Sequence, residues 1–225
     1  MVLAAQSDAA ALDQLLARYW RPVFAYLRAL GTASDEAADL TQAFVADVLL
    51  HRNLIARAEI DRGSFRGYLK VALKNFLIDA RRRESARKQA QQHVVVPASA
   101  DDRAHADAVD AEAPADAFDR LWAETVMNEA LSETRAHLVE TGFGKHWHVF
   151  ESRIVAPITS GNDARSMQDL AEEIGVDSPE DVSRLLFSAK RRFRNTLRRL
   201  VSETLTAETD PDDELDVLLG VLQSR

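Results

Sequence analysis

Positively charged side chains gather in two stretches of an otherwise acidic chain. The 225 residues carry a net charge of −8, yet residues 62–92 hold nine lysines or arginines against two acids, and residues 184–199 hold seven against none. Such one-sided clusters attract polyanions, because they neutralise phosphates and release the counterions around them. An ordinary solvated helix face is the alternative. The segregation of charge favours a polyanionic partner.

Residue types that catalyse reactions or bind metals form no suitable constellation. The chain has no cysteine, which excludes disulfides, thiolate zinc sites and a cysteine nucleophile. Residues 142–145 (GFGK) are too short for a phosphate-binding loop, and His146 and His148 would diverge on a helix. Carboxylates are concentrated in residues 101–119 and in the C-terminal tail, where nothing would hold a pair rigidly. We therefore predict a binding protein rather than an enzyme, with no cofactor and no metal.

Helical periodicity places the first basic stretch on a long helix. Residues 63–88 carry an apolar stripe and a separate row of cations at four-residue spacing. Apolar spacing predicts an earlier helix over 10–30, which Pro22 kinks or breaks, and another over 34–50 with a serine cap and two acids at its start. No strand pattern occurs, so the chain is predicted to be all-α.

The second basic stretch belongs to a predicted helix-turn-helix. Residues 166–169 form a capping box that opens a short helix, Gly175 ends this helix, and residues 178–181 form a second capping box with Pro179 at the first helical position. A short helix, a glycine-containing turn and a longer helix are typical of this motif. The longer helix, 178–200, combines an apolar face with the seven basic residues.

An acidic segment separates the two basic helices. Residues 101–119 hold seven acids against one arginine, and the surrounding stretch is rich in alanine and proline. Such a composition buries too little apolar surface to offset the entropy of ordering, which predicts a flexible linker; an alanine-rich surface helix is the alternative. We predict two helical domains, 8–92 and 118–205, joined by the acidic linker 93–117.

The C-terminus is predicted to be an acidic tail, residues 206–225, with a short amphipathic helix. Its apolar residues could dock on the second domain, and its acids are expected to shield the basic helices. The N-terminus lacks the segments of a secretory signal, and no apolar run is long enough to span a membrane. We expect a cytoplasmic protein without membrane insertion.

Two blocks of the chain, residues 8–92 and 118–205, resemble bacterial RNA polymerase sigma factors of the extracytoplasmic-function (ECF) group. Three sets of residues carry the resemblance. They are Asp39-Leu40-Thr41-Gln42 with Phe44, which is similar to the polymerase-docking helix of sigma region 2; Ser64-Phe65-Arg66, Tyr68-Leu69, Lys74-Asn75, Asp79 and Arg82-Arg83, similar to the DNA-binding helix of that region; and Ser166, Leu170-Ala171, Gly175-Val176, Val182, Leu186, Ala189 and Lys190-Arg191, similar to the region 4 helix-turn-helix.

The resemblance implies promoter-specific transcription initiation, with core RNA polymerase and promoter DNA as partners and an anti-sigma factor or another regulator as a further one. The 51–63 loop and the start of the 63–88 helix would hold the melted −10 element, and the 178–200 helix would enter the major groove of the −35 element. The implied site residues are Asp39, Leu40, Gln42 and Phe44 for polymerase; Arg66, Lys70, Lys74, Asn75, Arg81, Arg82 and Arg83 for the −10 element; and Ser183, Arg184, Phe187, Ser188, Lys190, Arg191 and Arg194 for the −35 element.

The sequence departs from the family pattern at three places. Ala43 stands where the family has an acid, residues 137–164 are longer and less basic than the usual lead-in, and Glu180 and Asp181 begin the helix expected in the major groove. Two other interpretations stay open. One is a helix-turn-helix regulator that binds duplex DNA without joining polymerase, and the other is a helical adaptor whose basic faces bind acidic proteins.

Overall fold

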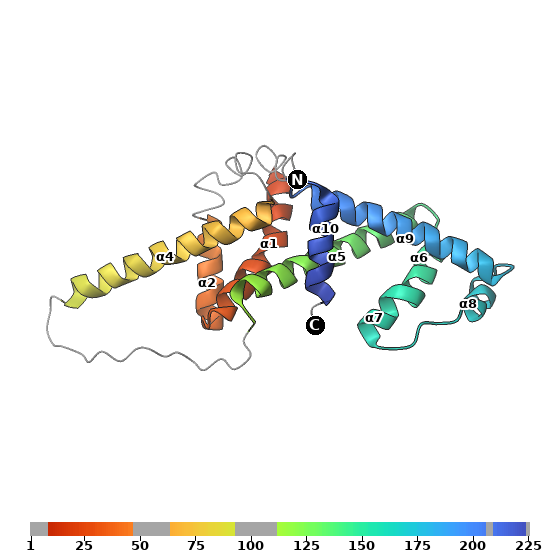
Figure 1. Ribbon diagram of the computed structural model, residues 1–225, viewed down its shortest axis with the longest axis horizontal. Helices are drawn as coiled ribbons and strands as arrows, with labels where there is room; N and C mark the ends of the chain where they lie inside the picture. The colour runs from red at the N-terminus through yellow and green to blue at the C-terminus, as the bar shows by residue number, and fades with distance from the viewer. Residues whose placement is uncertain (1–8, 47–63, 93–111, 206–208, 224–225) are drawn as a thin grey trace. The chain divides into compact units, whose positions relative to one another are not determined.

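The protein is built from helices, as predicted. The computed structural model describes residues 9–46, 64–92, 112–205 and 209–223, and these ranges contain no strand (Figure 1). The helices are α1 (Ala9–Ala29), α2 (Ser34–Phe44), α4 (Phe65–Gln92), α5 (Pro114–Glu140), α6 (Gly144–Phe150), a π-helical turn (Glu151–Val155), α7 (Ala156–Ser160), α8 (Met167–Ile174), α9 (Pro179–Ser202) and α10 (Pro211–Gln223). Pro22 lies inside α1, which continues through it as one helix.

The helices belong to two compact units. The first comprises residues 1–124 together with 202–225, and the second comprises residues 125–201. These units differ from the predicted domains, because the start of α5 and the C-terminal α10 both belong to the first unit. Phe118 and Trp122 of α5 and Leu218 of α10 are completely buried, which explains why these segments stay with the first core.

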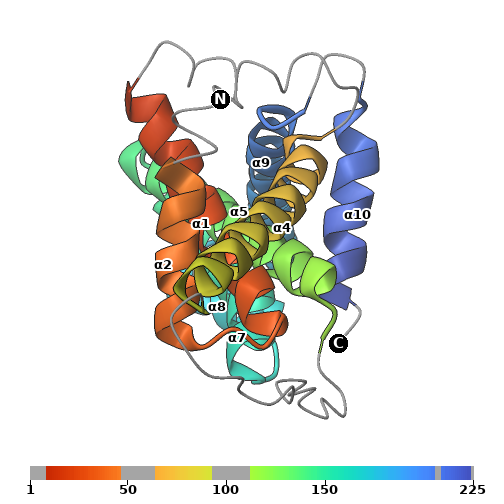
Figure 2. The same cartoon turned by 90° about the vertical axis from the view of Figure 1, so that its left-hand side faces the viewer.

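The core of the first unit is a row of apolar side chains from α1, α2 and α4, closed by the start of α5. On α4 the buried positions recur at three- and four-residue intervals, as an amphipathic helix requires. Figure 2 shows α1 and α2 on one side of α4 and α10 on the other. The buried residues are Leu15, Tyr19, Val23 and Leu27 on α1, Ala37, Thr41 and Phe44 on α2, and Phe65, Leu69, Leu73 and Phe76 on α4.

Aromatic contacts join the helices of this core. Tyr19 meets the edge of Phe65 with ring centroids 5.2 Å apart and stacks on Phe118 at 6.4 Å. Phe44 packs edge-to-face on Phe76 at 5.5 Å. Edge-to-face and offset contacts at these distances add to the burial of apolar area. Burial raises the pKa of the Tyr19 phenol to about 12, so the ring stays neutral within the core.

The second unit has its own core. Side chains from the end of α5 and from α6, α8 and α9 pack together, and Phe150 contacts both Trp147 and Phe193 at centroid distances of 5.8 and 5.4 Å. The buried members of this cluster are Leu138, Trp147, Val149, Phe150, Leu170, Ala171, Val182, Leu186 and Ala189. The long lead-in of residues 137–164, where apolar spacing at Trp147, Phe150 and Ile154 indicates a helix, thus supplies α6 to this core.

Phe44 provides a test of this packing, because the family resemblance assigned it to a polymerase-docking surface. Replacing Phe44 with alanine should lower the free energy of unfolding by about 3–5 kcal/mol through lost burial and a residual cavity. Replacing its exposed neighbour Gln42 with alanine should change it by less than about 0.5 kcal/mol. Urea unfolding followed by helical circular dichroism measures both values, and equal midpoints for the two variants would contradict the core position of Phe44.

Candidate nucleic-acid interface

Within the second unit, α8 and α9 form the predicted helix-turn-helix. The Ser166 hydroxyl oxygen accepts a hydrogen bond from the Asp169 backbone N–H at 3.0 Å, which caps α8. α8 ends at Gly175, whose φ of 64° lies in the left-handed region that glycine adopts without strain. The predicted cap and glycine stop are therefore confirmed, and they fix the turn between the two helices.

A second cap begins α9. The Ser178 hydroxyl oxygen accepts from the Asp181 N–H at 3.3 Å and donates to the Asp181 carboxylate at 3.0 Å. Asp181 also contacts the Arg184 guanidinium one turn along the helix. The hydrogen bond from Ser178, followed by the contact with Arg184, holds the pKa of Asp181 below its usual value. Asp181 thus serves as part of the cap, and its charge faces a cation.

α9 has one buried face and one exposed, basic face. Val182, Leu186 and Ala189 are buried in the core of the second unit. The opposite side presents Phe187, which is 69% exposed, among polar and cationic side chains. An α-helix with such a face fits the major groove of duplex DNA, where polar side chains can contact base edges. The exposed residues predicted for this role are Ser183, Arg184, Phe187, Lys190, Arg191 and Arg194, and Ser188 is half-buried.

The cations of this face are available to phosphates. Among the described residues, no carboxylate forms an ion pair with Lys190, Arg191 or Arg194. Arg184 differs from them, because Asp181 already contacts it. Lysines and arginines that no carboxylate holds are suited to the backbone of a nucleic acid, where each contact releases counterions.

A cavity of about 210 Å³ lies beside α9 in the second unit. It is bordered by the end of α5, the start of α6 and four residues of α9, and its described lining includes no acid. Cationic and polar side chains line it together with the apolar Leu138 and Phe143. Sequence reasoning missed this arrangement, because its members come from three helices. The lining residues are His137, Leu138, Phe143, His146, Ser188, Arg191, Arg192 and Asn195.

The first unit presents a second basic surface on the far part of α4. Lys74, Asn75 and the three arginines 81–83, which the family resemblance assigned to the −10 element, are exposed. Val71 and Ile78, at 59% and 47% exposure, lie on the same helix. A surface that combines cations with apolar groups suits a single strand, whose phosphates and unstacked bases are both accessible.

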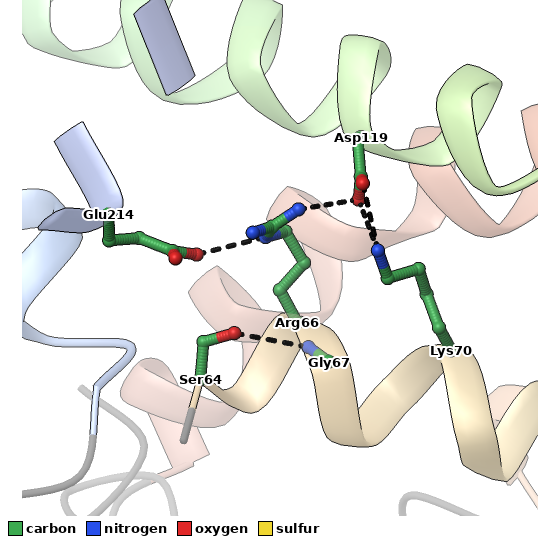
Figure 3. Close-up of polar contacts among 6 residues, drawn as sticks. All are labelled: Ser64, Arg66, Gly67, Lys70, Asp119 and Glu214. Carbon is green, nitrogen blue, oxygen red and sulfur yellow. Dashed lines mark hydrogen bonds and ion pairs between the residues drawn. The ribbon is translucent and has the colours of Figure 1, made fainter. Parts of the chain in front are cut away.

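The start of α4 is different, because its two predicted DNA-binding cations are held inside the unit (Figure 3). Arg66 is 7% exposed and forms ion pairs with Asp119 of α5 at 2.7 Å and with Glu214 of α10 at 2.9 Å. Lys70 donates to both oxygens of Asp119 at 2.8 and 2.9 Å. The guanidinium of Arg66 also lies 4.8 Å from the ring centroid of Trp122. Arg66 and Lys70 are thus paired with carboxylates of α5 and α10.

Electrostatics keep Arg66 charged within this network. Burial disfavours its charged form, but the hydrogen bond and the charge of Glu214, followed by those of Asp119, outweigh burial and raise the pKa of Arg66. The adjacent Ser64 hydroxyl oxygen accepts from the Gly67 N–H at 3.2 Å and caps α4. A buried cation of this kind requires its carboxylates, because an unpaired charge away from water is strongly destabilising.

The predicted polymerase-docking residues of α2 divide between surface and core. Asp39 and Gln42 are exposed, Leu40 is half-buried, and Phe44 is fully buried against Phe76. Phe44 therefore positions α2 instead of presenting a contact surface. The 51–63 loop, which was expected to hold the melted strand, lies outside the described residues.

The described residues contain no group of three or more histidines or acids placed to bind a metal ion. The described helices include none of the length and apolar character that crossing a membrane requires. His148 pairs instead with Glu173 at 3.0 Å, on the surface of the second unit.

Comparison with known proteins gives no match. The chain matches no protein-family model, no curated protein and no solved structure. Its function must therefore be inferred from the residues and from their geometry.

The Arg66 network gives a testable consequence for stability. Arg66→Met should destabilise the first unit by about 3 kcal/mol, because Glu214 is left as a buried, unpaired carboxylate. The double variant Arg66→Met with Glu214→Met should lose less than the sum of the two single changes, and urea unfolding in a double-mutant cycle measures the difference.

Arg120→Met is the matched control for this cycle. Arg120 pairs with Glu112 and Glu124, but its side chain is 30% exposed, so its loss should cost less than about 1 kcal/mol. Additive effects of the Arg66 and Glu214 changes would show that the pair does not couple α4 to α10.

Proposed function

We propose that this protein is an RNA polymerase sigma factor of the extracytoplasmic-function type, which binds core enzyme and directs transcription from specific promoters. The observation that carries the proposal is the capped helix-turn-helix whose α9 turns an exposed, basic, Phe187-centred face outward. α9 enters the major groove of the −35 element, where Ser183, Phe187 and Ser188 contact bases and the cations of the same face contact phosphates.

In this proposal the first unit binds the −10 element. The exposed Lys74, Asn75 and Arg81–Arg83 of α4 form the surface for the melted strand. The exposed Asp39 and Gln42 of α2 contact core polymerase. Because polymerase is the partner, the site of action is the cytoplasm. An anti-sigma factor or another regulator is a further partner in this scheme.

A second function, a helix-turn-helix regulator that does not join polymerase, is favoured by a different observation. Phe44 is buried in the core, and Arg66 and Lys70 pair with carboxylates of the same unit. These three side chains of the first unit are therefore already engaged within the protein. In the second unit, no carboxylate of the described residues occupies the cations at positions 190, 191 and 194. Polymerase binding by the first unit therefore decides between the two functions.

The first test is transcription with bacterial core RNA polymerase. The protein should form a complex with core enzyme on gel filtration and yield discrete run-off transcripts from a pool of genomic DNA fragments. The double change Asp39→Ala with Gln42→Ala should abolish the complex while DNA binding by the second unit is kept. Asp35→Ala, also exposed on α2, is the control. DNA binding without any complex or transcript would favour the regulator and overturn the sigma proposal.

A second test separates base contacts from phosphate contacts on α9. Arg194→Ala should weaken binding to all duplex sequences alike and reduce the slope of log affinity against log salt by about 0.9, as loss of one phosphate contact predicts. Phe187→Ala should leave the salt slope unchanged and reduce discrimination between promoter and random DNA. Arg135→Ala, an exposed arginine of α5 in the same unit, is the control. Equal effects of Arg194→Ala and Arg135→Ala would show that this face of α9 does not contact DNA.

A further inference from the structure

Residues 204–205 and α10 are attached to the start of α4, and together we call them the C-terminal strap. The backbone N–H of Phe65, the first residue of α4, donates to the Thr204 carbonyl at 3.0 Å. Ser64 and Leu205 form an isolated antiparallel bridge beside this bond. Thr204 itself is 1% exposed. The strap thus occupies backbone groups where α4 begins.

Side chains of α10 extend this attachment. Leu218 is completely buried in the first unit, and Glu214, 7% exposed, pairs with the Arg66 side chain at 2.9 Å. Figure 3 shows the Arg66 guanidinium lying between Glu214 on one side and Asp119 on the other. The strap therefore buries a predicted DNA-binding cation, which places an acidic helix where a polyanion would have to lie.

We infer that the C-terminal strap is an autoinhibitory element, which must detach from α4 before Arg66 can bind a nucleic-acid phosphate. The inference rests on the proposed function of α4 as a surface for single-stranded DNA. A guanidinium offers its donors in one planar fork, so Glu214 and a phosphate compete for the same N–H groups.

Backbone and side-chain contacts both hold the strap. Its first residues are joined to α4 by backbone contacts at Ser64 and Phe65, and α10 is held by Glu214 and the buried Leu218. The ion pair weakens when a competing anion is present, because phosphate offers Arg66 an equivalent partner. Detachment also leaves Asp119 and Trp122 in place, since both belong to α5 and still contact Arg66.

An engineered disulfide tests the strap in the full chain. The protein has no cysteine, so Ser64→Cys with Leu205→Cys introduces its only two thiols. Directly opposed residues of an antiparallel bridge lie about 4.5–5.5 Å apart at Cα, within the range of about 4.4–6.8 Å that a disulfide spans. Oxidation fixes residue 205 of the strap to the start of α4 and so restrains α10, and reduction removes this link. Both states share the same charges and the same loss of the Ser64 cap.

The readout is the fluorescence anisotropy of a labelled single-stranded DNA oligonucleotide at about 50 mM salt. The reduced protein should bind at least about threefold more tightly than the oxidised protein, and the slope of log affinity against log salt should steepen by about 0.7, because Arg66 then neutralises one more phosphate. Wild-type protein, which has no thiol, should be insensitive to the reductant. Equal affinity in the two redox states, with circular dichroism showing both folded, would overturn the inference.

A matched pair of charge changes provides an independent measurement. Glu214→Gln and Asp213→Asn each remove one negative charge from α10, but Asp213 is exposed and Glu214 contacts Arg66. Glu214→Gln should raise affinity for the oligonucleotide, and Asp213→Asn should leave it within about twofold of wild type. The same change in affinity from both variants would mean that the net charge of the tail, and not the Arg66 contact, governs binding.

Different results would overturn the strap inference and the proposed function. Redox-dependent binding to single-stranded DNA without promoter-dependent transcripts supports the strap and overturns the sigma proposal. Transcription in the presence of core enzyme, together with equal affinity of the locked and released forms, supports the sigma proposal and overturns the strap.

Discussion

The first unit depends on a buried arginine that needs carboxylates from two other helices. Arg66 lies at the start of α4, and its guanidinium is satisfied by Asp119 of α5, Glu214 of α10 and the ring of Trp122. A charge with little access to water is tolerated only when such partners are present. These pairs link α4 to the start of α5 and to α10, which belong to the same unit. The apolar core around Tyr19 and Phe118 then fixes where α5 lies.

In the second unit, α9 carries apolar side chains on one face and cations on the opposite face. The apolar face belongs to the core with α6 and α8, and the opposite face carries cations and an exposed phenylalanine. Serine caps at both helix starts and a left-handed glycine set the turn. The caps, the turn and the apolar face are all formed within the unit, so the basic face of α9 is left for a partner.

The acidic residues of the chain have two different uses. Asp119 lies just after the predicted linker 93–117, and Glu214 belongs to the acidic tail, yet both are structural partners of Arg66. Asp181, at the start of α9, completes the cap and contacts Arg184. The acids near α4 and in the C-terminal tail therefore form specific ion pairs with basic side chains. These ion pairs determine which lysines and arginines remain exposed for a ligand.

The sequence by itself determined the all-α class, the caps at Ser166 and Ser178, the glycine stop and the amphipathic character of α4 and α9. These features depend on interactions within about four residues, which periodicity and capping patterns report directly. Only the tertiary structure decided that Phe44 is buried and that α10 packs on the first unit. It also decided that Arg66 is held by Glu214, which is 148 positions away in the chain. Charge counts along a sequence show how many cations a helix carries, but pairing depends on which distant carboxylates the packed core brings within reach.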